Sequence, residues 1–296
     1  MIVPKLVCDN VLSELQKCQS ETVDLVIADP PYFRVTNNKW DRSWKTLNDY
    51  IEWAKMWLSE TYRILRHGGS FYLFGYMRIM AHLVPYLTEL GFEYREEITI
   101  NKGIQAVAGR ATKEYKLFPN VTETVILLVK NPRPHIQKLL LNAAKTKKLD
   151  SKSINTALGL KTNGGGMWSI YTGNNICAQI PTEEMWLKFQ KILGIDTPYC
   201  KVSQTFNTQI GLTNVWGDIS FRLTDRIHPT QKPEKLIDRL VLASSNENDL
   251  IYDLFSGSGI VLYRSAILNR RCVGIEVDAD MHKKSIDMLK SKLFSS

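Results

Sequence analysis

Apolar residues along the chain fall into short continuous runs and into longer stretches with helical spacing. Residues 23–28 form a short, mostly apolar run with β-branched side chains, which is typical of a buried strand. Apolar residues recur at roughly helical intervals over 50–66, and His67-Gly68-Gly69 is expected to end that helix. The same criteria predict strands over 70–74, 121–129, 250–254 and 272–277, and helices over 78–90, 233–244, 260–268 and the last residues of the chain. Gly91 is expected to end the helix over 78–90. Strands that alternate with helices indicate an α/β fold with a largely parallel sheet covered on both faces.

The middle segment, residues 131–217, differs from both of its flanks. Its apolar pattern is weak and it contains three consecutive glycines, so we expect an irregular segment here. Ten basic residues against four acidic ones give it a formal charge of +6, out of +8 for the chain of 296 residues. A basic balance favours a polyanionic partner such as nucleic acid. The segment is therefore either a solvated insertion or a module that contacts a phosphate backbone.

The overall composition narrows the class of protein. Hydrophobic residues make up 44% and charged residues 23%, which excludes a mainly disordered, collagen-like or coiled-coil chain. No apolar run approaches the ~20 residues of a membrane span, and the first ten residues lack the pattern of a secretory signal. The five cysteines are scattered without a C-x-x-C pair. We therefore expect reduced thiols, no metal site and a cytoplasmic location.

Asp29-Pro30-Pro31-Tyr32 directly follows the first predicted strand. Ligands of open α/β sheets bind at the carboxyl ends of strands. The two prolines fix the backbone and lack N–H donors, so together with Asp29 they form a rigid group of hydrogen-bond acceptors. Tyr32 adds an aromatic face on which a flat heterocycle can stack. The alternative is an ordinary turn after a strand.

A glycine-rich motif, Asp253-Leu254-Phe255-Ser256-Gly257-Ser258-Gly259, joins a predicted strand to a predicted helix. Glycines at such a turn let the backbone approach a ligand closely. Glu276 ends the next strand, 17 residues beyond Gly259, near the spacing at which dinucleotide-binding folds hold ribose hydroxyls. The third glycine of a pyrophosphate-binding turn is absent, so the motif favours a nucleoside cofactor without phosphates.

A third motif, His228-Pro229-Thr230-Gln231-Lys232-Pro233, leads into a helix and taken alone could be a helix entry capped by Thr230. The three motifs together, in this order around a basic middle segment, resemble the circularly permuted β-class of DNA amino-methyltransferases that use S-adenosylmethionine. Two smaller features are also similar to that family: Arg63 to Gly69 and Asn120 to Thr124. The family often has two threonines where this chain has Ile260 and Val261.

The resemblance implies a fold and a function. The fold is an α/β, Rossmann-like methyltransferase fold with a largely parallel seven-stranded sheet, circularly permuted, with an inserted target-recognition region. Residues 1–130 and 218–296 would form the catalytic domain, with cofactor binding in the latter, and 131–217 the insert. The activity would be methyl transfer from S-adenosylmethionine to the N6 amine of a flipped-out adenine in duplex DNA, as part of a restriction–modification system.

The resemblance also implies which residues act. Asp29 and the carbonyl of Pro30 would accept hydrogen bonds from the target amine, next to Pro31, and Tyr32 would stack on the base. Glu276 would hold the cofactor ribose, whereas Asp253 would either face the methionine amine or cap the glycine-rich turn. The expected cofactor-binding residues are Asp9, Asp29, His228, Thr230, Gln231, Lys232, Asp253, Phe255, Gly257, Gly259, Glu276 and Asp278.

Duplex DNA is the implied partner, together with a cognate restriction endonuclease and a second copy of the chain, since dimers are common in the family. The loop 33–46 is expected to fold over the bound base or cofactor. Candidate phosphate contacts are Lys102, Arg110, Lys113, Lys116, Lys145, Lys147 and Lys148.

Three other functions remain open. N4-cytosine methylation is the nearest, although D-P-P-Y is typical of adenine targets in the family and S-P-P-Y is commoner for cytosine. A DNA-binding subunit without catalysis is disfavoured by the intact Asp29 and Tyr32. Methylation of a protein glutamine is disfavoured because it uses N-P-P-Y in an unpermuted chain.

Overall fold

The computed structural model describes residues 2–33, 43–103, 118–160, 166–174, 176–222, 226–228 and 230–294. The chain divides into two compact units, one of residues 1–130 and 205–296, the other of residues 131–204. The second unit therefore ends before position 217, the expected end of the insert. Across the described ranges, no helix has both the length and the apolar character needed to cross a bilayer.

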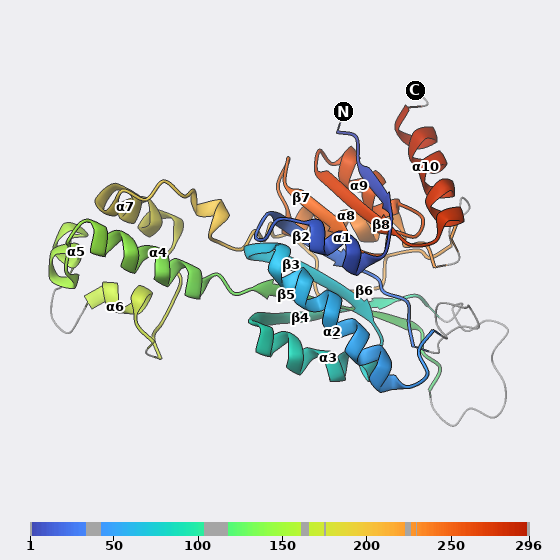
Figure 1. Cartoon of the computed structure of the whole chain (residues 1–296), viewed down its shortest axis with the longest axis horizontal. Coiled ribbons are helices and arrows are strands. Elements are labelled where there is room, and N and C mark those ends of the chain that lie inside the picture. Colours follow the sequence, from blue (N-terminus) through green and yellow to red (C-terminus); the bar gives the residue numbers. More distant parts are fainter. Residues whose placement is uncertain are drawn as a thin grey trace. The chain divides into compact units, whose positions relative to one another are not determined.

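The first unit is built on one eight-stranded sheet with the order β1-β8-β7-β2-β3-β5-β4-β6 (Figure 1). The strands are β1 (Lys5–Cys8), β2 (Val23–Ala28), β3 (Leu65–Gly75), β4 (Phe92–Asn101), β5 (Thr122–Lys130), β6 (Val215–Trp216), β7 (Leu250–Asp253) and β8 (Arg271–Glu276). All neighbouring strands are parallel except β5, which is antiparallel to β3 and β4. The α/β class and the largely parallel sheet are confirmed. An eighth strand, the two-residue β6, joins the seven that were expected.

Helices cover both faces of this sheet, because strand residues alternate between two apolar cores. Val26 and Ala28 of β2 pack with one core, to which α1 (Val11–Lys17), α2 (Leu47–Ile64) and α3 (Met77–Leu90) contribute. Leu25 and Ile27 face the other core, formed with α8 (Glu234–Ser244), α9 (Ile260–Ile267) and α10 (Ala279–Phe294). Both faces of β2 are buried, which explains its nearly continuous apolar run.

One turn prediction was wrong. Gly68 and Gly69 do not end a helix but lie inside β3, which follows α2 without a loop. A side chain at position 69 would come within 2.8 Å of the Leu65 side chain and 3.0 Å of the Asp24 carbonyl, so the close packing of β3 on β2 requires glycine there. By contrast, Gly91 ends α3 in the left-handed conformation (φ 103°), as predicted.

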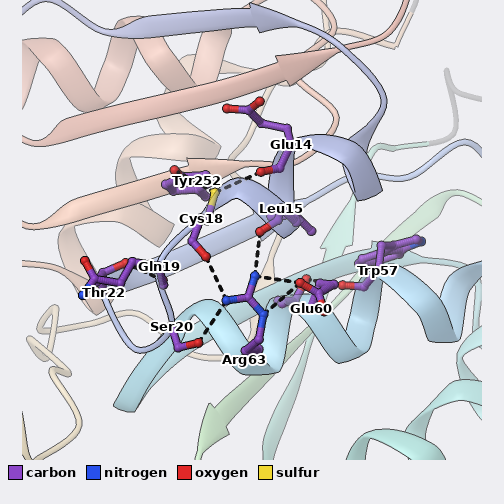
Figure 2. Close-up of polar contacts among 11 residues, drawn as sticks. Glu14, Leu15, Cys18, Gln19, Ser20, Thr22, Trp57, Glu60, Arg63 and Tyr252 are labelled. Atoms are coloured by element: carbon purple, nitrogen blue, oxygen red, sulfur yellow. Dashed lines mark hydrogen bonds and ion pairs between the residues drawn. The ribbon is translucent and has the colours of Figure 1, made fainter.

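Arg63, near the end of α2, ties this helix to the end of α1 (Figure 2). Its guanidinium donates to the carbonyls of Leu15 (2.7 Å) and Cys18 (2.8 Å) at the end of α1. Glu60 accepts two further hydrogen bonds from the same group, at 2.9 and 2.7 Å.

The second unit is helical, so the expectation of an irregular segment was wrong. It contains α4 (Arg133–Thr146), α5 (Ser151–Ala157), α6 (Gly166–Thr172) and α7 (Glu183–Leu193) (Figure 1). These helices surround a core of their own that includes Leu140, Ile154, Trp186 and Phe189. Two of them are only seven residues long, too short to reveal a helical period in the sequence.

Candidate active site

Asp29-Pro30-Pro31-Tyr32 follows β2, in the middle of the carboxyl edge of the sheet. β7 and its neighbours end on one side of it, and β3 with its antiparallel partner β5 lies on the other. We call the first side, with Asp9, Asp253 and Glu276 at the ends of β1, β7 and β8, the acidic half. We call the second side, with Tyr76, Glu123 and Lys232, the cavity half.

Asp29 is held by hydrogen bonds to both of its carboxylate oxygens. Tyr32 donates its hydroxyl to Oδ1 at 2.6 Å, and the Lys232 ammonium lies 2.6 Å from Oδ2. The same ammonium lies 2.6 Å from Oε1 of Glu123 on β5. Each carboxylate oxygen has two lone-pair sites, so Asp29 retains acceptor capacity toward a ligand.

Lys232 is 7% exposed and lies above the Phe74 ring, 4.9 Å from its centre. Burial alone would lower the pKa of Lys232, but the charges and hydrogen bonds of Asp29 and Glu123 outweigh it and raise the pKa above its ordinary value. The ammonium therefore stays protonated at any physiological pH. Burial and the nearby charge of Asp29 likewise raise the pKa of Tyr32, so its hydroxyl remains a donor.

A cavity of about 610 Å³ opens next to these residues. Tyr32, Tyr76, Glu123, Phe221 and Lys232 are among its lining residues. The rings of Tyr32 and Tyr76 meet edge to face with their centres 5.2 Å apart. An aromatic wall beside a carboxylate and an ammonium suits a flat, polar heterocycle.

On the acidic half, the glycine-rich turn joins β7 to α9. Gly257 and Gly259 have φ angles of +48° and +76°, which favour glycine at both positions. Asp253 is 3% exposed. Burial raises its pKa to about 7, although the Phe255 N–H partly offsets this, and the charges of Asp29 and Glu276 raise the pKa further. This N–H contact is compatible with Asp253 as a cap of the turn.

Glu276, at the end of β8, accepts hydrogen bonds from the backbone N–H groups of Gly257 and Asp278, each at 2.8 Å. Partial burial raises its pKa, an effect that these N–H groups reduce. In the described part of the chain, neither Asp253 nor Glu276 forms an ion pair with a lysine or arginine. Two nearby carboxylates without a cation favour a positively charged ligand that also offers hydroxyl groups.

Asp9 lies beside Glu276, since its N–H donates to the Glu276 carbonyl at 3.2 Å. Its carboxylate is paired with Lys17 at 2.6 Å, and hydrogen bonds from Lys17, Asn10 and Ser13 lower its pKa. Asp9 thus lies next to Glu276 but differs from Asp253 and Glu276 in having its own cation, Lys17.

The His228 motif contributes to both halves. The ring of His228 lies 3.7 Å from where a side chain at Gly257 would begin, and Thr230 hydrogen-bonds its Nδ1 at 3.0 Å. Burial lowers the pKa of His228, which favours the neutral ring. Gln231 accepts the Ile227 N–H at 3.0 Å, while Gln231, Thr230 and Lys232 line the cavity. Thr230 does not cap α8, whose N-cap is Pro233.

Phe255 packs away from the turn. Its ring centre lies 5.2 Å from that of Trp57 and 6.0 Å from that of Trp53, both on α2. Trp44, near the end of the loop 33–46, continues this aromatic cluster through Trp53, at 4.6 Å. Residues 34–42 of that loop lie outside the described residues.

The expected DNA contacts are only partly described. Lys102 lines the cavity, whereas Arg110, Lys113 and Lys116 lie outside the described residues. Lys145, Lys147 and Lys148 lie at the end of α4 in the second unit.

Two residues of this site were missed in the sequence. Glu123 was expected only as the glutamate of a strand similar to one in the family, without a role in the site, and Tyr76 was not singled out. The available signal for Glu123 was a glutamate near the start of a strand that is apolar from Val125 to Val129, because a carboxylate in such a place is rarely buried unless it is paired.

Comparisons with known proteins agree with this geometry. A family model described as DNA methylase, for N6 and N4 amino-methyltransferases, matches residues 23–287. The chain therefore belongs to the DNA methylase family. It is 26% identical to the type II methyltransferase M.HpaI of Haemophilus parainfluenzae, over 98% of this chain and 74% of that one. It is 25% identical to the DNA adenine methyltransferase YhdJ of Escherichia coli, over 95% and 80% of the two chains.

Solved structures share the fold. M1.HpyAVI, solved as a complex with S-adenosylmethionine, matches with a TM-score of 0.56 at 16% identity, over 97% of this chain and all of that one. A Thermus thermophilus protein solved with the same ligand matches with a TM-score of 0.58 at 15% identity, over 99% and 98% of the two chains. The Rossmann-like methyltransferase fold is thus confirmed.

Proposed function

We propose that this protein transfers a methyl group from S-adenosylmethionine to the N6 amine of a specific adenine in duplex DNA. The observation that carries the proposal is the position of Asp29 between an acidic half without a buried cation and a cavity half with one. Membership of the DNA methylase family supports the reaction class. The adenine assignment is supported by D-P-P-Y and by the similarity to a DNA adenine methyltransferase.

The acidic half fits S-adenosylmethionine in its chemistry. This cofactor supplies a methyl group on a positively charged sulfur, and it carries an amino group and ribose hydroxyls but no phosphate. Asp253 and Glu276 provide carboxyl oxygens as acceptors for such groups, and a bound cation would favour the ionised form of both carboxyls. Gly257 and Gly259 leave room for close approach at the turn. Asp9 and Asp278 lie next to Glu276 and would complete the adenosine side.

Asp29 would orient the target amine rather than act first as a base. The lone pair of an exocyclic amine is conjugated with the ring, so the amine is a poor nucleophile. Hydrogen bonds from the amine to Asp29 and to the carbonyl of Pro30 draw the nitrogen toward tetrahedral geometry. Positioning of this kind can supply on the order of 7–11 kcal/mol. Asp29 then accepts the proton that the methylated nitrogen releases.

The cavity half would receive the base after it leaves the helix. Flipping costs a few kcal/mol, which stacking in the pocket partly offsets. Tyr32 and Tyr76 provide aromatic surface there. We propose that the second unit, 131–204, together with the rest of the segment up to 217, reads the target sequence. A cognate endonuclease and a second copy of the chain are further proposed partners.

Sequencing that maps modified bases in DNA exposed to the protein and S-adenosylmethionine tests this function. We expect N6-methyladenine at one short sequence, and none with the Asp29→Ala variant. N4-methylcytosine after digestion to nucleosides would overturn the adenine assignment. Cofactor binding without methyl transfer to any mixed-sequence duplex would favour a DNA-binding subunit that lacks catalysis.

A further inference from the structure

The ammonium of Lys232 is a hydrogen-bond donor that lies directly beside the Asp29 carboxylate, the acceptor for the target amine in the proposed reaction. Its ammonium lies 2.6 Å from Oδ2 of Asp29 and lines the cavity of the cavity half. Lys232 was expected on the cofactor side, by resemblance. Its contacts are instead with Asp29, Glu123 and Phe74, on the side of the base.

An acceptor and a donor this close together match one edge of adenine and one edge of cytosine. In adenine and cytosine, the carbon that bears the amine also bonds a ring nitrogen with a lone pair, so donor and acceptor stand side by side. Thymine presents the reverse order, a carbonyl oxygen beside a ring N–H. Its carbonyl oxygen would face the Asp29 carboxylate, and its N–H would face the Lys232 ammonium, so neither pair could form a hydrogen bond.

We propose that Lys232 donates a hydrogen bond to the ring nitrogen next to the target amine and so selects the amino edge of the flipped base. This inference rests on the proposed function and assigns Lys232 as a specificity-determining residue of that same site. The amine binds Asp29, and the neighbouring ring nitrogen binds Lys232.

Glu123 makes this arrangement stable. An ammonium has three N–H donors, and in the described part of the chain Asp29 and Glu123 are its two hydrogen-bonding partners, which leaves one donor for the base. The second carboxylate also keeps the ammonium protonated despite its burial. Lys232 is therefore always a donor and cannot accept from the N–H of a wrong base.

The test replaces a single atom of the DNA. Two duplexes carry the target sequence that the sequencing experiment identifies. One has adenine at the target position, and the other has 1-deazaadenine, in which a C–H group replaces the ring nitrogen next to the amine. If cytosine proves to be the target, 3-deazacytosine serves in the same way. Single-turnover rates at saturating cofactor are measured for the wild type, for Lys232→Met and for Lys235→Met. Lys235 is the matched control, because it lies three residues further along the chain, in the first turn of α8, and pairs with Asp218 outside the cavity.

The wild type and Lys235→Met should methylate the deaza base about 10- to 100-fold more slowly than the normal base, as expected for loss of one charge-assisted hydrogen bond. Lys232→Met should be slow on both bases and should discriminate between them less than about 3-fold. Comparing the ratio of the two rates in Lys232→Met with the same ratio in the wild type cancels any intrinsic difference in reactivity between the two bases. The wild-type comparison stands even if Lys232→Met does not fold, since the change is in the DNA.

Equal wild-type rates on the two bases would overturn the inference and leave the proposed function intact. Unchanged discrimination in Lys232→Met, with weaker S-adenosylmethionine binding by calorimetry, would also overturn it and return Lys232 to the cofactor. Absence of methyl transfer to either normal base would overturn the proposed function as well.

Discussion

The acidic half and the cavity half are built from the same type of residue but balance their charge differently. In the cavity half, Asp29 and Glu123 share the buried ammonium of Lys232. In the acidic half, Asp253 and Glu276 have no lysine or arginine partner among the described residues, and burial raises the pKa of both. Carboxylates already paired with a cation orient a neutral base, whereas unpaired ones attract a cationic ligand. On this ground we propose that the acidic half binds the cofactor and the cavity half binds the base.

The largest expected effect comes from the residue between the halves. Asp29→Ala should slow methyl transfer on the order of 10³-fold or more, because the amine loses its orienting acceptor. S-adenosylmethionine affinity, measured by calorimetry, should change only a few-fold. Asp280→Ala, at an exposed position on α10, is the control. Normal turnover by Asp29→Ala would refute the mechanism.

The next effect concerns stability in the acidic half. Asp253 holds its proton up to pH of about 7 in the native state, but releases it near pH 4 when unfolded. The native state binds the extra proton between these values, so the free energy of unfolding falls as pH rises through that window and is flat above it. Asp253→Asn should remove this contribution, at most about 4 kcal/mol.

Urea unfolding of both proteins at pH 4.5 and 7.5 measures this difference. The wild type should lose stability relative to Asp253→Asn at the higher pH. Parallel pH profiles for the two proteins would mean that the Asp253 carboxyl titrates normally.

Glu123→Gln probes the cavity half without changing its shape. The Lys232 ammonium would then pair with one negatively charged carboxylate, that of Asp29, instead of two, and Asp29 would be held less firmly. The single-turnover rate at saturating cofactor should fall about 10- to 100-fold, with cofactor affinity unchanged. A loss of cofactor affinity instead would mean that the two halves are not separate.

Glu276→Gln should have the smallest effect. It keeps an acceptor oxygen for the backbone N–H groups but removes the charge, so the cofactor Kd should rise about 10-fold. Fluorescence or calorimetric titration measures this Kd. An unchanged Kd would place the cofactor ribose elsewhere.

The sequence was informative where a feature is local. The apolar run of β2 and the glycine that ends α3 both depend on neighbours in the chain, and both were predicted correctly. Gly69 was misread because the contact that requires glycine, with the Asp24 carbonyl, comes from another strand. The short helices of the second unit bury their apolar residues only against one another, so no single helix shows a clear period.

In the site, too, local features could be predicted from the sequence and contacts between distant residues could not. The motifs made Asp29 and Glu276 candidate site residues, because strand ends and turns have recognisable patterns. The link from Lys232 to Glu123 joins residues distant in the chain, and no local pattern reveals such a pair. Nor does the sequence show that Asp253 is buried enough to hold a proton near neutral pH.

The most direct test of the division into two halves is one titration of the methyl-transfer rate against S-adenosylmethionine concentration, for Glu276→Gln and Glu123→Gln side by side. The division predicts that Glu276→Gln approaches the wild-type rate as the cofactor saturates, whereas Glu123→Gln reaches a plateau about 10- to 100-fold lower. If both variants recovered fully, or if neither did, the assignment of one half to the cofactor and the other to the base would be contradicted.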